Sequence, residues 1–105
     1  KVKTVGELFN EYIAQLKDEG RLGYALSVQQ VYNSLYKYKG HLDIYFSEID
    51  VNWLKSYEVW LRCSKLADNT IGIRFRTLRA VYNLALTEGL VKPDCYPFKK
   101  YKVSK

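Results

Sequence analysis

Residues 68–89, DNTIGIRFRTLRAVYNLALTEG, indicate most clearly how this chain folds. The apolar residues of this stretch recur every three or four positions, as in a helix that buries one face: Ile71, Phe75, Leu78, Tyr82 and Leu86. Asp68 or Asn69 is expected to cap the start of this helix, and Gly89 fits the position just after its end. The same stretch contains three arginines: Arg74, Arg76 and Arg79. Because no acidic residue lies between positions 69 and 87, the arginines raise the question of what they contact.

Three more helices are predicted upstream of this stretch. Thr4 and Glu7 have the form of a capping box, and apolar residues follow at helical spacing to about residue 19. A second helix is expected to begin between residues 24 and 27 and to stop at Gly40. The segment that follows is a connector with apolar anchors. Asp50 is expected to cap a third helix, whose inner face is formed by Leu54, Tyr57 and Leu61.

The helices predict a compact, all-α, orthogonal bundle of four to five helices that spans residues 1–90. A chain of 105 residues with 48% hydrophobic residues is long enough for one domain with a core of its own. Residues 91–105 contain two prolines and several lysines without apolar periodicity, and we expect an extended basic linker there.

Positive charge is distributed unevenly along the chain, which has 17 Lys and Arg residues and 11 Asp and Glu residues. The second predicted helix has Lys37 and Lys39 without an acidic residue, and the fourth has its three arginines. Residues 90–105 add five lysines, among them Lys99 and Lys100, and one aspartate. This distribution is expected when two helices and a strap face a polyanion, whereas an acidic protein partner is the alternative.

Both basic helices have a polar face opposite their apolar stripe. On the second helix this face contains Ser27, Gln30, Asn33 and Lys37. On the fourth it contains Asn69, Thr70, Ile73, Arg74 and Thr77. Gln and Asn can pair with adenine, Arg can pair with guanine, and a helix N-terminus favours phosphate. Arg76 projects to one side and Arg79 lies at the edge of the core stripe. The alternative interpretation is that both polar faces are ordinary helix surfaces exposed to solvent.

The sequence offers no catalytic or metal-binding pattern. Cys63 and Cys95 lack the spacing of a disulfide framework or a zinc site, and His41, the only histidine, lies in the predicted connector. We expect no metal and no cofactor. There is no run of 18 apolar residues and no secretory leader, so a soluble, cytoplasmic protein without membrane contact is expected.

The segment FSEIDVNWLKSYEVWLRCSKLADNTIGIRFRTLRAVYNLALTEGLV, followed by YPFKKYKV, resembles the N-terminal core-binding domain of bacterial tyrosine recombinases. The nearest resemblance is to integrases of phages and conjugative transposons. It implies a SAM-like helical bundle that forms one jaw of a clamp around double-stranded DNA, with the second and fourth helices facing the DNA. It also implies a catalytic domain later in the same chain, a tetramer on DNA when the protein is full length, and no catalytic residue in this part.

By position, the resemblance makes Ser27, Gln29, Gln30 and Lys37 contact residues on the second helix, and Asn69, Thr70, Arg74 and Thr77 contact residues on the fourth. Together with the polar faces and the basic tail, the full set of expected DNA-binding residues is Ser27, Gln29, Gln30, Asn33, Lys37, Asn69, Thr70, Arg74, Arg76, Thr77, Lys99 and Lys100.

Overall fold

The computed structural model describes residues 3–97 and confirms the predicted all-α bundle. Its α-helices are α1 (Val5–Asp18), α2 (Leu22–Lys39), α3 (Val51–Cys63) and α4 (Asp68–Thr87). Two short 3-10 helices, η1 (Phe46–Glu48) and η2 (Pro93–Cys95), lie in the connections, and the described part of the chain contains no strand. None of the described helices combines the length and apolar character that a membrane span requires.

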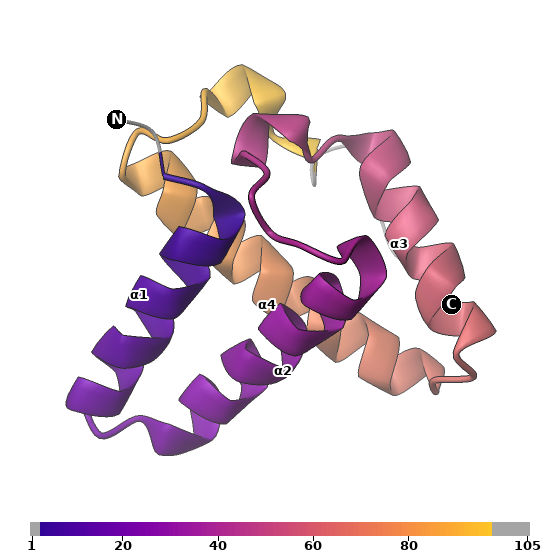
Figure 1. Cartoon of the computed structure of the whole chain (residues 1–105), viewed down its shortest axis with the longest axis horizontal. Helices are drawn as coiled ribbons and strands as arrows, with labels where there is room; N and C mark the ends of the chain where they lie inside the picture. The colour runs from indigo at the N-terminus through magenta and orange to yellow at the C-terminus, as the bar shows by residue number, and fades with distance from the viewer. Residues whose placement is uncertain (1–2, 98–105) are drawn as a thin grey trace.

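Helix α4 is the central element of the bundle. It crosses the pair formed by α1 and α2 and also packs against α3 (Figure 1). Four residues of the predicted stripe are buried: Ile71, Phe75, Leu78 and Tyr82. Leu86 is only half-buried, whereas Val81 and Ala85 are fully buried beside the stripe. The buried surface of α4 is therefore wider than one stripe, because neighbours cover it from several sides.

Two of the predicted helix caps are present. The hydroxyl of Thr4 accepts a hydrogen bond from the backbone N–H of Glu7 (3.3 Å), and the Glu7 carboxylate accepts one from the backbone of Thr4 (2.9 Å). Asp50 caps α3 by accepting a hydrogen bond from the backbone N–H of Trp53 (2.8 Å). These bonds satisfy donors that have no partner inside the helix and so fix where α1 and α3 begin.

Two predicted helix starts were wrong. Helix α2 begins earlier than expected, at Leu22, without a side-chain cap. Helix α4 follows Ala67, and neither Asp68 nor Asn69 caps it. Asp68 is instead the first residue of α4, and its carboxylate is bound by Arg62 of α3. The fourth helix therefore contains one acidic residue, Asp68, and Arg62 balances its charge.

The chain continues to pack against the bundle after α4. Gly89 adopts a left-handed conformation (φ 75°), and the N–H of Leu90 reaches back to the carbonyl of Ala85 at 2.9 Å. This is the Schellman arrangement that glycine favours at helix ends. Val91 and Pro97 are buried, and η2 lies between them, so the extended conformation predicted after Gly89 was wrong for residues 90–97. The domain boundary at residue 90 stays a prediction.

The connector between α2 and α3 is fastened to the start of α1. The backbone N–H groups of Val5 and Gly6 donate to the carbonyls of Ile44 (2.7 Å) and Leu42 (3.1 Å). A Cβ atom at Gly6 would lie only 3.1 Å from the Cβ atom of Leu42, so this close approach favours glycine.

Nearby, the ammonium of Lys3 lies 2.6 Å from a carboxylate oxygen of Glu11 and 3.3 Å from one of Glu88. These contacts join the start of α1 to the end of α4.

Candidate nucleic-acid interface

A hollow of about 320 Å³ opens between α2, the end of α3 and the first turns of α4. In Figure 1, α2 runs through the lower middle of the bundle, and the end of α3 and the start of α4 lie at the lower right. The polar residues that line the hollow are Gln30, Asn33, Ser34, Lys37, Ser64 and Arg74. Its apolar lining residues are Trp60, Leu61 and Leu66. The hollow therefore brings together polar residues of α2 and α4 that are more than 35 positions apart in the sequence.

Arg74 bridges α4 and α2 across this hollow. Its Nη1 donates a hydrogen bond to the backbone carbonyl of Gln30 at 3.3 Å. Its Nε is buried and has no hydrogen-bond partner among the described residues. Arg74 is thus half-buried, and its guanidinium is oriented by α2. A buried donor without a partner is uncommon in proteins and costs part of the free energy that its desolvation requires.

The residues of α2 beside Arg74 form an organised polar rim. The side-chain amide of Gln29 donates to Oδ1 of Asn33 at 3.0 Å, which leaves the amino group of Asn33 able to donate. Gln30 and Lys37 are exposed, and within residues 3–97 Lys37 forms no salt bridge. The rim therefore presents amide groups and one ammonium to solvent.

A hydrogen bond between Ser34 of α2 and Tyr57 of α3 joins the two helices beside the hollow. The hydroxyls of Ser34 and Tyr57 lie 2.7 Å apart, and Tyr57 is fully buried. Burial raises the pKa of Tyr57, and the hydrogen bond with Ser34 and the charge of Arg74 partly oppose this rise. The phenol stays protonated at neutral pH, so this contact is a neutral hydrogen bond that holds α2 against α3.

The turn between α3 and α4 is held by a cluster of charged residues. Glu58 is buried, with 7% of its surface exposed, and its carboxylate lies 2.9 Å from Nη2 of Arg62. Nη1 of the same arginine contacts the carboxylate of Asp68. The two acids and the arginine thus fasten the first turn of α4 to the last turns of α3, which fixes the positions of Asn69 and Thr70.

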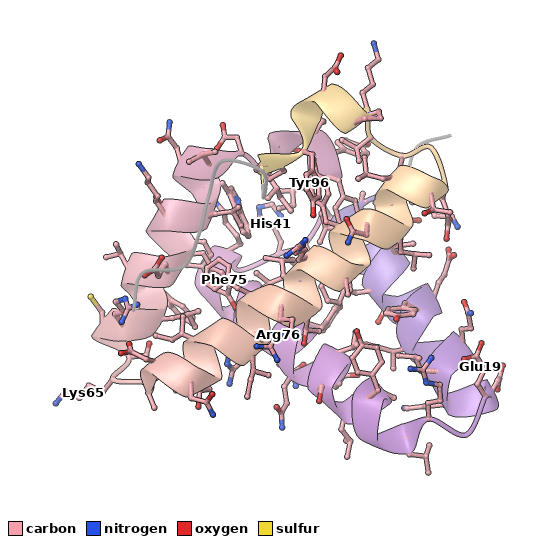
Figure 2. All side chains as sticks on the ribbon, turned by 180° about the vertical axis from the view of Figure 1, so that it is seen from behind. Glu19, His41, Lys65, Phe75, Arg76 and Tyr96 are labelled. Atoms are coloured by element: carbon pink, nitrogen blue, oxygen red, sulfur yellow. The ribbon has the colours of Figure 1, made fainter. Side chains whose placement is uncertain are left out.

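The structure places most of the predicted contact residues at the surface. Five are exposed: Gln30, Asn33, Lys37, Asn69 and Arg76. Four are half-buried: Ser27, Gln29, Thr70 and Arg74. Figure 2 shows Arg76 on α4 and Lys65 in the turn before it. Whether these residues bind DNA stays a prediction.

One expected contact residue is not at the surface. Thr77 is buried, with 6% of its surface exposed, so its predicted place on the open face of α4 was wrong. The face is narrower than helical spacing alone indicated, because α4 packs against three neighbours at once. Lys99 and Lys100 lie outside the described residues.

Sequence reasoning missed the contribution of α3 to this surface. Trp60, Ser64 and Leu66 line the hollow, although the third helix and its following turn were not among the expected contacts. The only signal was that Trp60 lies one heptad after Trp53, beside the inner face of α3. Spacing can place a residue at the edge of a buried face, but it cannot say which neighbour that edge meets.

The lone histidine lies in the connector between α2 and α3. His41 is exposed, and its Nδ1 accepts a hydrogen bond from the backbone N–H of Asp43 at 3.3 Å. Among residues 3–97, no group of three or more His, Cys, Asp or Glu side chains is arranged as a metal site. The arrangement at the hollow instead offers hydrogen-bond donors and positive charge, which suit an anionic ligand with polar edges.

Comparison with known proteins gives one match. The model of the phage integrase SAM-like domain family matches residues 4–103, which is nearly the whole chain. No curated protein sequence and no solved structure matches significantly.

Proposed function

Since this chain belongs to the phage integrase SAM-like domain family, we propose that it is the DNA-binding domain of a tyrosine recombinase and forms one jaw of a clamp on duplex DNA. In this proposal the side formed by α2 and the start of α4 faces the DNA. The chemistry of strand cleavage belongs to another domain of the full-length protein, which acts as a tetramer on DNA.

The observation that carries the proposal is the meeting of Gln30, Asn33 and Lys37 of α2 with Arg74 of α4 at one hollow. These side chains combine charge for phosphate with amide groups for base edges, which is the mixture that DNA-binding surfaces use. Lys37 and Arg76 form no salt bridge within residues 3–97, so an external anion would not have to displace a protein carboxylate.

Separate roles follow for the residues on this side. Lys37 and Arg76 neutralise phosphates, and Asn69 and Thr70 offer polar groups at the N-terminus of α4, where backbone N–H groups favour phosphate. Gln30 and Asn33 are proposed to read base edges. The lysines at 99 and 100 are proposed to continue the contact along the exit from the domain.

A mobility-shift titration of duplex DNA at several salt concentrations tests the proposal. Lys37→Ala should weaken binding to all duplexes similarly and reduce the slope of log K against log salt by about one unit, as expected for one lost phosphate contact. Lys17→Ala is the matched control, because Lys17 is exposed on α1 and does not line the hollow.

Equal effects of the two substitutions would place the DNA on another side of the bundle. If no duplex binds even at low salt, while an acidic protein does, the domain is an interaction module and the proposal is wrong.

A further inference from the structure

We infer that the hollow between α2, α3 and α4 takes one nucleotide of a DNA strand whose base has left the stack. This inference rests on the proposed function, because it assumes that DNA lies on this side of the bundle. It adds a ligand class, an unstacked nucleotide, that contact with an intact duplex does not require.

The charged part of the hollow suits the phosphate of such a nucleotide. Lys37 and Arg74 both line it, and its lining among the described residues includes no carboxylate. Nε of Arg74 is buried without a hydrogen-bond partner there, whereas its Nη1 is held by the carbonyl of Gln30. Because Nε is covered by protein, a phosphate oxygen would be contacted by the outer nitrogens of this guanidinium, which α2 already holds in place.

The apolar part of the hollow is what an intact duplex does not explain. Trp60, Leu61 and Leu66 contribute to its lining, and Trp60 is half-buried. A stacked duplex presents phosphates, sugars and the edges of its bases, but the faces of its bases are covered by their neighbours. An unstacked base has an open face, and aromatic side chains bind such faces with little sequence preference.

Trp60 is held rigidly enough to serve as such a surface. Its ring is stacked on Tyr57, with centroids 6.1 Å apart and planes inclined by 16°, and Tyr38 packs against it at 5.3 Å. These contacts hold Trp60 in one orientation before any ligand binds, which reduces the entropy lost on binding. The volume of about 320 Å³ is at the lower end of the range for ligand sites, which suits one nucleotide.

The rim supplies groups that could contact the edge of the base. Asn33 has its amino group available because its oxygen accepts from Gln29, and the amide of Gln30 is exposed beside it. The hollow thus offers an aromatic surface, amides and cations within one site, in the combination that a nucleotide requires.

The test compares a fully paired duplex with the same duplex carrying one unpaired nucleotide, each bound to the 105-residue chain. The bulged duplex is expected to bind about tenfold more tightly, in line with the stacking of one base on an aromatic side chain. Ser64→Phe should abolish this preference, because Ser64 is exposed at the edge of the hollow and a phenyl ring there would fill it without changing any charge. Ser56→Phe is the matched control, since Ser56 is exposed on α3, the helix that Ser64 follows, and does not line the hollow.

The outcomes separate this inference from the proposed function. If both duplexes bind equally and with steep salt dependence, the hollow holds at most a backbone phosphate, and the inference is overturned while the function stands. If only the bulged duplex binds, the nucleotide site stands and the duplex clamp is wrong. If Ser56→Phe abolishes the preference as Ser64→Phe does, the hollow is not the site.

Tryptophan fluorescence gives a second, independent measurement. The chain has two tryptophans, so Trp53→Phe leaves Trp60 as the only reporter. The bulged duplex should quench its emission more strongly than the paired duplex. A free deoxynucleoside monophosphate that quenches as strongly at the same concentration would overturn the assignment to a DNA strand and indicate a site for free nucleotides.

Discussion

Leu78→Ala tests the placement of α4 at the centre of the bundle. Leu78 is 0% exposed, and α4 packs against α1, α2 and α3. Removing a buried leucine side chain costs about 2–5 kcal/mol, and the cost rises with the volume of the cavity that remains. The upper half of this range is expected, because α1 packs on α2 and a hydrogen bond joins α2 to α3, which limits how far these helices can move in to fill the space. A loss of this size is a large fraction of the roughly 5–15 kcal/mol that stabilises a typical domain.

Thermal and urea unfolding followed by circular dichroism would measure this loss. At about 4–8 °C per kcal/mol, Tm should fall by more than about 10 °C. Ile73→Ala is the matched control, because Ile73 lies on the same helix but is 44% exposed, and it should cost less than about 1 kcal/mol. If Leu78→Ala costs no more than Ile73→Ala, then α4 buries a different face from the one that contains Leu78.

Three further predictions concern individual contacts. Asp50→Ala should destabilise the fold by about 1 kcal/mol, because it removes the cap of α3. Asp68→Ala should cost less, because Asp68 caps no helix and its ion pair with Arg62 is exposed. Equal losses of the two variants in urea unfolding would contradict this prediction. Burial raises the pKa of Tyr12 to about 12. The stability that this phenol contributes is therefore complete below about pH 10 and is lost as the pH rises from 10 to 12. Tyr12→Phe should make the free energy of unfolding less dependent on pH in that window, and an unchanged pH profile would speak against the raised pKa. Tyr96→Phe keeps the ring against α4 but removes the hydroxyl that accepts a hydrogen bond from Nε of Arg79 at 3.0 Å. It should lower the free energy of unfolding by about 0.5–1.5 kcal/mol. Tyr36→Phe, at an exposed tyrosine, should cause no measurable change.

The sequence predicted the helices well, because their apolar spacing and two of their caps are local features. Thr4 and Asp50 cap the helices that follow them, as predicted, and each cap bond spans only three positions in the sequence. The start of α4 was predicted wrongly for a reason that is not local. The carboxylate of Asp68 binds Arg62, six positions earlier on another helix, and this tertiary contact replaces the cap.

The candidate site was predicted only in part. The polar faces of α2 and α4 were identified separately, and Lys37 and Arg74 do lie beside the same hollow. Thr77 was misplaced because helical spacing gives the direction of a side chain but not the number of neighbours that cover it. The contribution of Trp60 could not be foreseen, because it depends on how α3 is oriented against α2.

The contact of Lys3 with Glu88 has a practical consequence for experiments on this domain. It places the start of α1 beside the end of α4, and Arg74 lies roughly 20 Å away from Glu88 along the helix axis. A fluorescent dye or a biotin attached at residue 3 would therefore sit at the opposite end of α4 from the hollow. Surface plasmon resonance on a chain immobilised at that position should leave the α2–α4 side accessible to oligonucleotides, so that association and dissociation rates can be recorded without steric interference.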